Sequence, residues 1–291
     1  MSDPNKPRQF ELLRQIPGGG SVTLAGEEAG AGPAIVLVHG LSATRRNVLQ
    51  GSRHLLRRGY RLIAYDARGH GASSPAPDPS RYEYEDLVGD LGFVLDSFEL
   101  ESPVLVGASM GAATVMTFAL GHPERVPALV QIIPAYNGRS RTASIDHGTW
   151  EKLAAALESG GVDEFVQIAE PDSLPDRWRE IAREASRQRM ERHRHPAAVA
   201  AALRVVPRST AFEGLEALEA FEAPTLVVGS RDEADAIHPL EVARAYAERL
   251  PNSEFVVEDE GQSPLSWQGA RLSGLIGGFL ERSGVPPQPQ A

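Results

Sequence analysis

One serine of this chain occupies a pattern that makes a serine nucleophilic. The segment Gly107-Ala108-Ser109-Met110-Gly111 directly follows the apolar run Val104–Val106 and opens a helical pattern at Met110. A Gly-x-Ser-x-Gly motif between a strand and a helix forms a turn so tight that its flanking positions must be small, and it exposes the serine hydroxyl. We therefore predict Ser109 as a nucleophile and the Met110 N–H, at a helix N-terminus, as an oxyanion donor.

A second turn offers the other half of an oxyanion hole. His39-Gly40-Leu41 ends the aliphatic run Ala34–Val38, and the glycine lets the chain turn sharply toward the same site. We predict the backbone N–H of Leu41 as the second oxyanion donor. His39 itself is interpreted as a structural hydrogen-bonding residue rather than as a base.

The elements that must position these residues are read from hydrophobic periodicity. Near-continuous aliphatic runs are typical of strands covered on both faces, and helical patterns separate them, which predicts a parallel sheet with helices on both sides. Gly18-Gly19-Gly20 lies between two alternating runs and predicts an N-terminal hairpin. The expected strands are Ala34–Val38, Leu62–Tyr65, Val104–Val106, Leu129–Ile133, Thr225–Val228 and Phe255–Val257, and the expected helices are 45–58, 82–99, 110–120, 239–250 and 267–282.

Residues 135–210 interrupt this alternation, because they contain no strand-like run. Trp150–Leu157 and Trp178–Met190 are amphipathic and predict helices, so we expect a helical cap insertion that sets substrate choice. The core would then comprise residues 9–134 and 211–284. Residues 1–8 and the proline-rich tail 285–291 are expected to be disordered.

Composition limits the function classes. The chain has 291 residues, 29 basic and 39 acidic, for a net charge of −10, which argues against a nucleic-acid or anionic-membrane partner. The absence of cysteine excludes disulfides and thiolate chemistry. No apolar run approaches the roughly 20 residues that span a bilayer, and no secretory signal is visible. We expect a cytoplasmic protein with a small-molecule substrate and no cofactor; the sequence leaves the oligomeric state open.

Three segments together resemble the α/β-hydrolase superfamily: His39-Gly40, the Ser109 motif, and the run from Asp66 to Ser73. The resemblance implies an eight-stranded, mostly parallel sheet, and a triad in the chain order serine, acid, histidine. Asp232, in Gly229-Ser230-Arg231-Asp232, and Asp235, four residues before Pro239, are alternative candidates for the acid.

The sequence departs from the family pattern at the third triad position. Gly261-Gln262-Ser263-Pro264 stands where the family has Gly-His. A serine hydroxyl needs a base to remove its proton, and the glutamine amide has no usable basic site. The resemblance therefore leaves the proton-transfer step without its usual residue.

Three hypotheses address the missing base. His238 could approach Ser109 from the acid loop, the site could bind a small molecule or partner without hydrolysis, or Gln262 could be a replacement that preserves shape and traps substrate. The leading hypothesis is a serine hydrolase acting on a small, largely apolar ester or related acyl compound. His193 and His195 are an i, i+2 pair and would not share a helix face, so no metal site is predicted.

Overall fold

The protein is built around one eight-stranded sheet with the strand order β1-β2-β4-β3-β5-β6-β7-β8. The computed structural model describes residues 5–138, 147–170, 174–231, 237–260 and 269–288. β1 and β2 form the predicted antiparallel hairpin and β2 is antiparallel to β4, whereas all later pairs are parallel. The predicted fold class is therefore confirmed. The strands are β1 (Arg8–Gln15), β2 (Ser21–Ala29), β3 (Ala34–Val38), β4 (Arg61–Tyr65), β5 (Val104–Ala108), β6 (Leu129–Ile132), β7 (Thr225–Val228) and β8 (Ser253–Val256).

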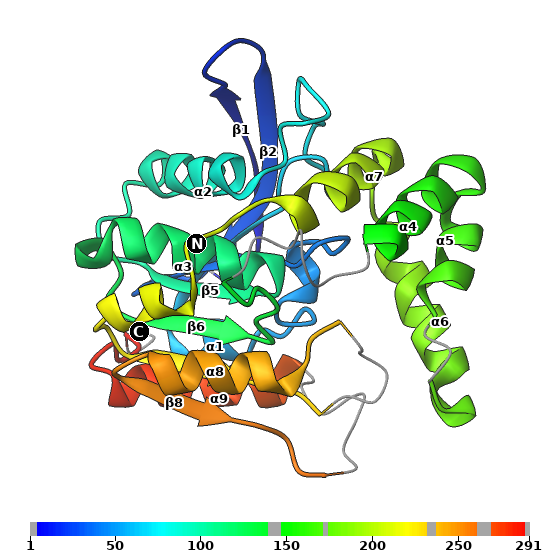
Figure 1. The fold of residues 1–291 in the computed structure, drawn as a ribbon. Helices are drawn as coiled ribbons and strands as arrows, with labels where there is room; N and C mark the ends of the chain where they lie inside the picture. Colours follow the sequence, from blue (N-terminus) through cyan, green and yellow to red (C-terminus); the bar gives the residue numbers. More distant parts are fainter. Residues whose placement is uncertain (1–4, 139–146, 171–173, 232–236, 261–268, 289–291) are drawn as a thin grey trace.

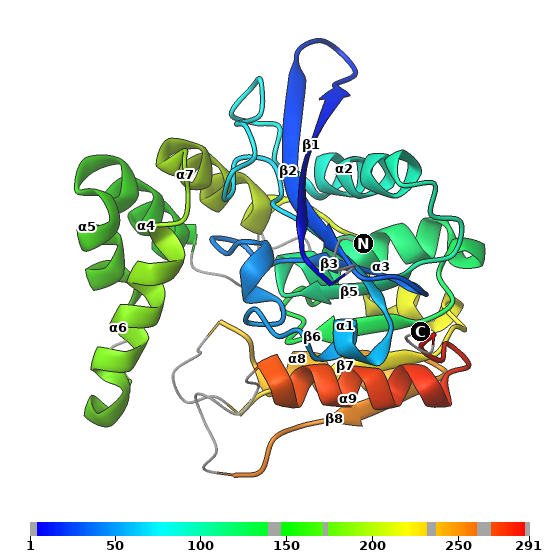
Figure 2. The same cartoon turned by 180° about the vertical axis from the view of Figure 1, so that it is seen from behind.

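Helices cover both faces of this sheet, which explains why its central strands are continuously apolar (Figures 1 and 2). Along β3, Val36 and Val38 belong to the core on one face, whereas Ile35 and Leu37 belong to the core on the other. The first face is covered by α2 (Tyr84–Ser97), α3 (Met110–Gly121) and α8 (Leu240–Arg249), and the second by α1 (His54–Arg58) and α9 (Gly269–Arg282).

One predicted helix is wrong in its extent. The pattern over 45–58 predicts a single helix, but the chain forms only a short 3₁₀ turn, η1 (Arg45–Asn47), and then α1. Between them, Gln50 and Gly51 have φ angles of 48° and 72°, in the left-handed region that ends a right-handed helix. The break leaves the segment between β3 and α1 as a loop.

The insertion between β6 and β7 contains only helices in the described residues, and it lies beyond the carboxyl ends of the parallel strands (Figure 1). The patterns over Trp150–Leu157 and Trp178–Met190 fall within two of these helices. The other two α-helices were not predicted. The insertion comprises α4 (His147–Ser159), α5 (Gly161–Ala169), α6 (Asp176–Met190), α7 (Pro196–Val205), and the 3₁₀ turns η3 (Val206–Arg208) and η4 (Leu215–Ala220). A further 3₁₀ turn, η2 (Pro123–Arg125), lies outside the insertion and precedes β6.

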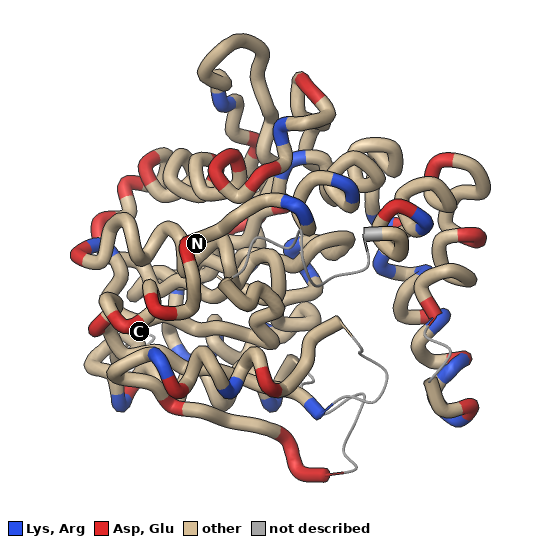
Figure 3. Tube along the Cα trace, viewed as in Figure 1, with Lys and Arg blue, Asp and Glu red and all other residues tan. Residues whose placement is uncertain are grey.

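The charged residues of α6 serve to hold the insertion together. Acidic and basic residues alternate along this helix (Figure 3). Arg179 and Arg183 both pair with Glu170, and Arg187 pairs with Asp163 of α5. Three of the five arginines of α6 therefore form ion pairs within the insertion. Among the described residues, no helix combines the length and the apolar character of a membrane span.

The structure describes parts of both segments for which the sequence predicts disorder, residues 5–8 and 285–288. β1 already begins at Arg8, inside the segment expected to be disordered. In the tail, the Val285 carbonyl accepts a hydrogen bond from the Tyr60 hydroxyl, and the Gln288 N–H donates to the Gly59 carbonyl. Residues 285–288, the described part of the tail, thus lie against the turn between α1 and β4.

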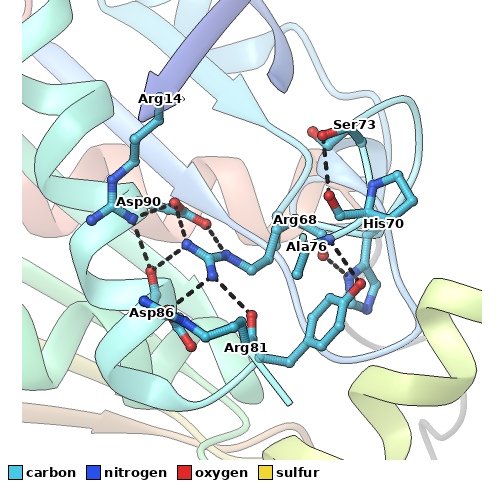
Figure 4. A network of polar contacts seen from close by, with 12 residues as sticks. Arg14, Arg68, His70, Ser73, Ala76, Arg81, Asp86 and Asp90 are labelled. Atoms are coloured by element: carbon cyan, nitrogen blue, oxygen red, sulfur yellow. Dashed lines mark hydrogen bonds and ion pairs between the residues drawn. The ribbon is translucent and has the colours of Figure 1, made fainter. Parts of the chain in front are cut away.

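A buried arginine fixes the turn that follows β4 (Figure 4). The Arg68 side chain is fully buried, and it donates two hydrogen bonds to the Asp90 carboxylate, at 2.6 and 2.8 Å, and one to the Arg81 carbonyl. Arg14 of β1 also reaches Asp90. Such a bidentate pair is strong and directional, so α2 and the turn after β4 are joined at one point in the interior.

Removal of the Asp90 carboxylate should destabilise the fold, because the buried Arg68 loses its bidentate partner and retains only a single ion pair, to Asp86 at 3.0 Å. We expect Asp90→Ala to lower the free energy of unfolding by about 3–5 kcal/mol, measured by urea denaturation. Asp96→Ala, in the same helix, is the control: its side chain is 68% exposed and pairs with Arg125 at the surface, so its loss should cost less than about 1 kcal/mol. Equal losses in the two variants would contradict this role of Asp90.

Candidate active site

Ser109 lies at the turn between β5 and α3 with φ 52° and ψ −112°. A positive φ is strained for a residue other than glycine. The two motif glycines allow this turn: a Cβ atom at Gly107 would lie 2.3 Å from the Gly111 carbonyl oxygen, and one at Gly111 would lie 2.1 Å from that of Val38. The Gly-x-Ser-x-Gly pattern is thus required by close backbone contact on both sides of the serine.

The structure brings His238 to this serine. The His238 Nε2 atom lies 2.7 Å from the Ser109 Oγ atom, although the residues are 129 positions apart. His238 is half-buried and stands two residues before α8, in the connection from β7. Since parallel strands end at one edge of the sheet, a residue that follows β7 can reach a turn that follows β5 across the end of β6.

The two predicted oxyanion donors follow the carboxyl ends of adjacent strands, β3 and β5. Gly40 is so close to the serine that a Cβ atom there would lie 3.2 Å from the Ser109 Cβ atom. In the part of the chain that the structure describes, neither the Leu41 N–H nor the Met110 N–H donates one of the turn or loop hydrogen bonds. Both amides therefore remain candidates for binding an oxyanion.

The remaining predicted site residues, Asp232, Asp235 and Gln262, lie outside the described residues. Ser230 and Arg231, the two residues just before Asp232, are held by hydrogen bonds. The buried Glu258 carboxylate, just beyond β8, accepts hydrogen bonds from the Ser230 hydroxyl at 2.7 Å and the Arg231 N–H at 2.5 Å. Sequence analysis missed Glu258; it is the first of three consecutive acids, Glu258, Asp259 and Glu260, that follow the apolar run, and nothing in the sequence distinguishes it from the other two.

Comparison with known proteins identifies the family. A sequence model described as "alpha/beta hydrolase fold" matches residues 33–270. A "Putative non-heme chloroperoxidase" from Synechocystis sp. is 30% identical over 270 residues, which cover 88% of this chain and 94% of the relative. The chain belongs to the α/β-hydrolase fold family.

Other relatives of this α/β hydrolase carry different names. "Epoxide hydrolase B" from Mycobacterium tuberculosis is 38% identical over 108 residues, 37% of this chain and 30% of the relative. The solved structure of a thermophilic esterase from Thermogutta terrifontis superposes with a TM-score of 0.73 at 27% identity, over 95% of this chain and 99% of the esterase. The family is thus shown, while its named members differ in chemistry.

Three buried histidines of this α/β hydrolase connect its core to the insertion. His39 Nε2 accepts the Ala67 N–H, so its Nδ1–H donates to the Gly40 carbonyl. His70 Nε2 accepts the Ser42 N–H, and the His70 and His39 ring centres are 5.2 Å apart. The expectation that His39 is structural agrees with these contacts.

His193 is the member of the cluster that the insertion contributes, and sequence analysis missed it. Its Nδ1 accepts the Gly71 N–H at 2.9 Å, and its Nε2–H donates to the Ser42 carbonyl at 3.1 Å. The adjacent Arg194 N–H donates to the Gly71 carbonyl. The link between α6 and α7 is therefore fastened to the loop that follows Leu41.

Burial keeps these rings neutral. Loss of solvation lowers the pKa of His39 and, with added repulsion from His39 and His193, lowers the pKa of His70 well below its usual value. Loss of solvation also lowers the pKa of His193 to about 4. A protonated ring could not accept its backbone N–H, so each neutral histidine preserves a contact of the loop beside the serine.

The insertion packs on the same loop through apolar contacts. The half-buried Leu41 side chain touches both the main core and the apolar cluster inside the insertion. Trp150 and Phe165 of the insertion lie within that internal cluster. Apolar helix faces pack on one another first, so these two aromatic rings are core residues of the insertion. No group of three or more metal-ligating side chains occurs among the described residues.

Acid should weaken this attachment in a defined pH range. Between pH 6.5 and about 4, the unfolded chain binds a proton at residue 193 that the folded protein does not, so stability falls as the pH decreases through this window. His193→Gln retains an acceptor and a donor without titrating. We expect it to remove about 3 kcal/mol of the difference in unfolding free energy between pH 7 and pH 4.

The measurement is urea denaturation of both proteins at a series of pH values. His195→Gln is the matched control, because His195 is exposed two residues away, and its pH dependence should equal that of the unmodified protein. An unchanged pH dependence in His193→Gln would show that other groups cause the acid sensitivity.

Proposed function

We propose that this protein is a serine hydrolase that cleaves small, largely apolar carboxylic esters, with Ser109 as nucleophile and His238 as general base. The 2.7 Å contact between the Ser109 Oγ atom and the His238 Nε2 atom carries this proposal. It falls within the roughly 2.6–3.2 Å over which a base can take a hydroxyl proton. The base would thus come from the connection between β7 and α8.

In the acylation step, the Ser109 oxygen attacks the ester carbonyl carbon while its proton passes to His238 Nε2. The carbonyl oxygen becomes an oxyanion, which the N–H groups of Leu41 and Met110 are placed to bind. The tetrahedral intermediate then collapses: the ester C–O bond breaks, and the imidazolium of His238 gives its proton to the departing alkoxide. An alcohol leaves, and the acyl group remains on Ser109.

Deacylation uses the same groups in reverse order. His238 Nε2 takes a proton from a water molecule as the water oxygen attacks the acyl carbonyl, and the same two N–H groups bind the oxyanion. When the bond to the Ser109 oxygen breaks, His238 returns the proton to that oxygen. The carboxylic acid departs, and the site is restored.

A carboxylate near the His238 ring would hold it in the correct tautomer and stabilise the imidazolium. Asp232 and Asp235 are both on the same connection and both remain candidates for this role. The Glu258 contacts to Ser230 and Arg231 support this arrangement, because they fix the start of the connection. Gln262 would then have no part in proton transfer.

Several observations favour an apolar ester as substrate. The name of the Thermogutta terrifontis structure denotes an esterase, although other relatives are named for peroxidase or epoxide chemistry. Leu41 presents an apolar side chain next to the insertion. A net charge of −10 disfavours an anionic substrate.

Two substitutions test the mechanism. Ser109→Ala should abolish hydrolysis of p-nitrophenyl butyrate and prevent the covalent adduct that a serine-reactive phosphonate forms, as seen by intact mass. His238→Ala should lower kcat/KM by at least about 10³-fold. The loss should be larger for ethyl butyrate, because its alkoxide leaving group needs the proton from His238, whereas p-nitrophenolate leaves without one.

His195→Ala controls for the general effect of removing a histidine, since that side chain is exposed in the insertion. Full activity in His238→Ala would remove the proposed base. Absence of both turnover and phosphonate adduct in the folded, unmodified protein would instead favour a non-hydrolytic binding protein. Strong turnover created by Gln262→His in such a protein would then locate the deficit at position 262.

A further inference from the structure

A cavity of about 260 Å³ is lined by residues of β2, β3, β4 and α1, and Figure 2 shows α1 on the face of the sheet that α9 also covers. Its walls come from β2, β3 and β4 and from the segment between η1 and α1. In the described part of the chain, the lining includes none of Ser109, His238, Leu41 or Met110. The volume is near the lower end of the roughly 300–1,000 Å³ that small-ligand sites occupy.

The floor of this cavity is apolar and built from rigid elements. Strand residues on the α1 face of the sheet and side chains of the covering loop and helix supply apolar surface on which a hydrocarbon chain could pack. The floor residues are Ala29, Leu37, Leu49, Leu56, Leu62 and Ala64.

The rim is positively charged. Arg45, Arg46 and Arg53 line the cavity together with one acid, Glu27. Asp66 already neutralises Arg45, through an ion pair to the guanidinium and a 2.8 Å hydrogen bond from the Arg45 N–H. The other two arginines against one glutamate leave a net charge of about +1, which matches a monoanion.

One of these arginines has capacity for a ligand. Arg46 is exposed, and within the described residues its guanidinium has no hydrogen bond or ion pair. The Arg45 guanidinium is held by Asp66 and by the Gln9 side-chain oxygen, and its Nε atom is buried, so the charge available to a ligand at this point of the rim is that of Arg46.

We propose that this cavity is a binding site for an amphiphilic monocarboxylate, such as a medium-chain fatty acid. The hydrocarbon chain occupies the apolar floor, and the carboxylate binds Arg46 at the rim. The inference does not depend on the proposed ester hydrolysis, because the site shares no described residue with the catalytic machinery.

The test is isothermal titration of butanoate, hexanoate and octanoate into Ser109→Ala protein, so that binding is measured without turnover. Affinity should rise about fourfold for each methylene group that the cavity buries. 1-Octanol, which has the same chain without the charge, should bind at least about tenfold more weakly than octanoate.

Two further variants locate the site. Arg46→Ala should weaken octanoate binding about tenfold, and Ala64→Leu should block it by filling the floor. Arg57→Ala is the matched control, because Arg57 is exposed on α1 and outside the cavity wall. Ser109→Ala should bind octanoate as the unmodified protein does.

The proposal is overturned by any of three results: no saturable octanoate binding, equal binding of octanoate and 1-octanol, or unchanged binding in Arg46→Ala. Thermal unfolding of each variant shows whether it is folded. If Ala64→Leu does not fold, the surface variant Arg46→Ala and the 1-octanol comparison still decide. None of these outcomes bears on whether Ser109 and His238 hydrolyse esters.

Discussion

The turn at Ser109 is the constraint on which the rest of the site depends. β5 must pass into α3 through a single residue, and this forces a φ of 52°, a strain of about 1–3 kcal/mol. The strain is sustained by packing, since Gly111 is pressed against the Val38 carbonyl of β3. Because β3 continues directly into Gly40 and Leu41, the contact that permits the strained serine also brings the Leu41 N–H, the second proposed oxyanion donor, to the same edge of the sheet. The proposed nucleophile and oxyanion hole would therefore form one packing unit rather than two independent features.

The position of the proposed base along the chain is less constrained, because a parallel sheet brings the connections that follow its strands to one edge. What proton transfer requires is a ring nitrogen at hydrogen-bond distance from the serine, and a triad is defined by geometry and roles rather than by position in the chain. A histidine after β7 has to cross the end of β6 to reach β5. Glu258, just beyond β8, holds the start of the connection between β7 and α8 through Ser230 and Arg231. The positions of these two residues and of the start of α8 therefore limit where His238 can lie.

The sequence was most informative where burial on both faces imposed a pattern. β3 and β7 match their predicted bounds. The Ser109 motif indicated the correct turn, because a Cβ atom at either glycine would clash with a backbone carbonyl oxygen. The sequence patterns did not predict the helix break at Gln50 and Gly51, because a left-handed backbone conformation causes it. They also did not predict the alanine-rich α7, because that helix has no polar stripe. The contact of His193 with Gly71 and Ser42 joins segments more than a hundred residues apart, and no spacing rule could have indicated it. The approach of His238 to Ser109 could be suggested as a hypothesis only through the strand order that the family resemblance implied.

The environments of the histidines separate structural from chemical roles. In His39 and His193, both ring nitrogens are bonded to backbone groups, so protonation would break an accepted N–H bond in the interior, and burial depresses the pKa accordingly. Such rings cannot exchange protons with a substrate without loosening the loop that they hold. His238 instead is half-buried and directs Nε2 at a hydroxyl, where gaining a proton is the useful event. By remaining neutral, the buried histidines keep the loop after Leu41 in place, and the proposed mechanism assigns the proton transfer to the more exposed ring of His238.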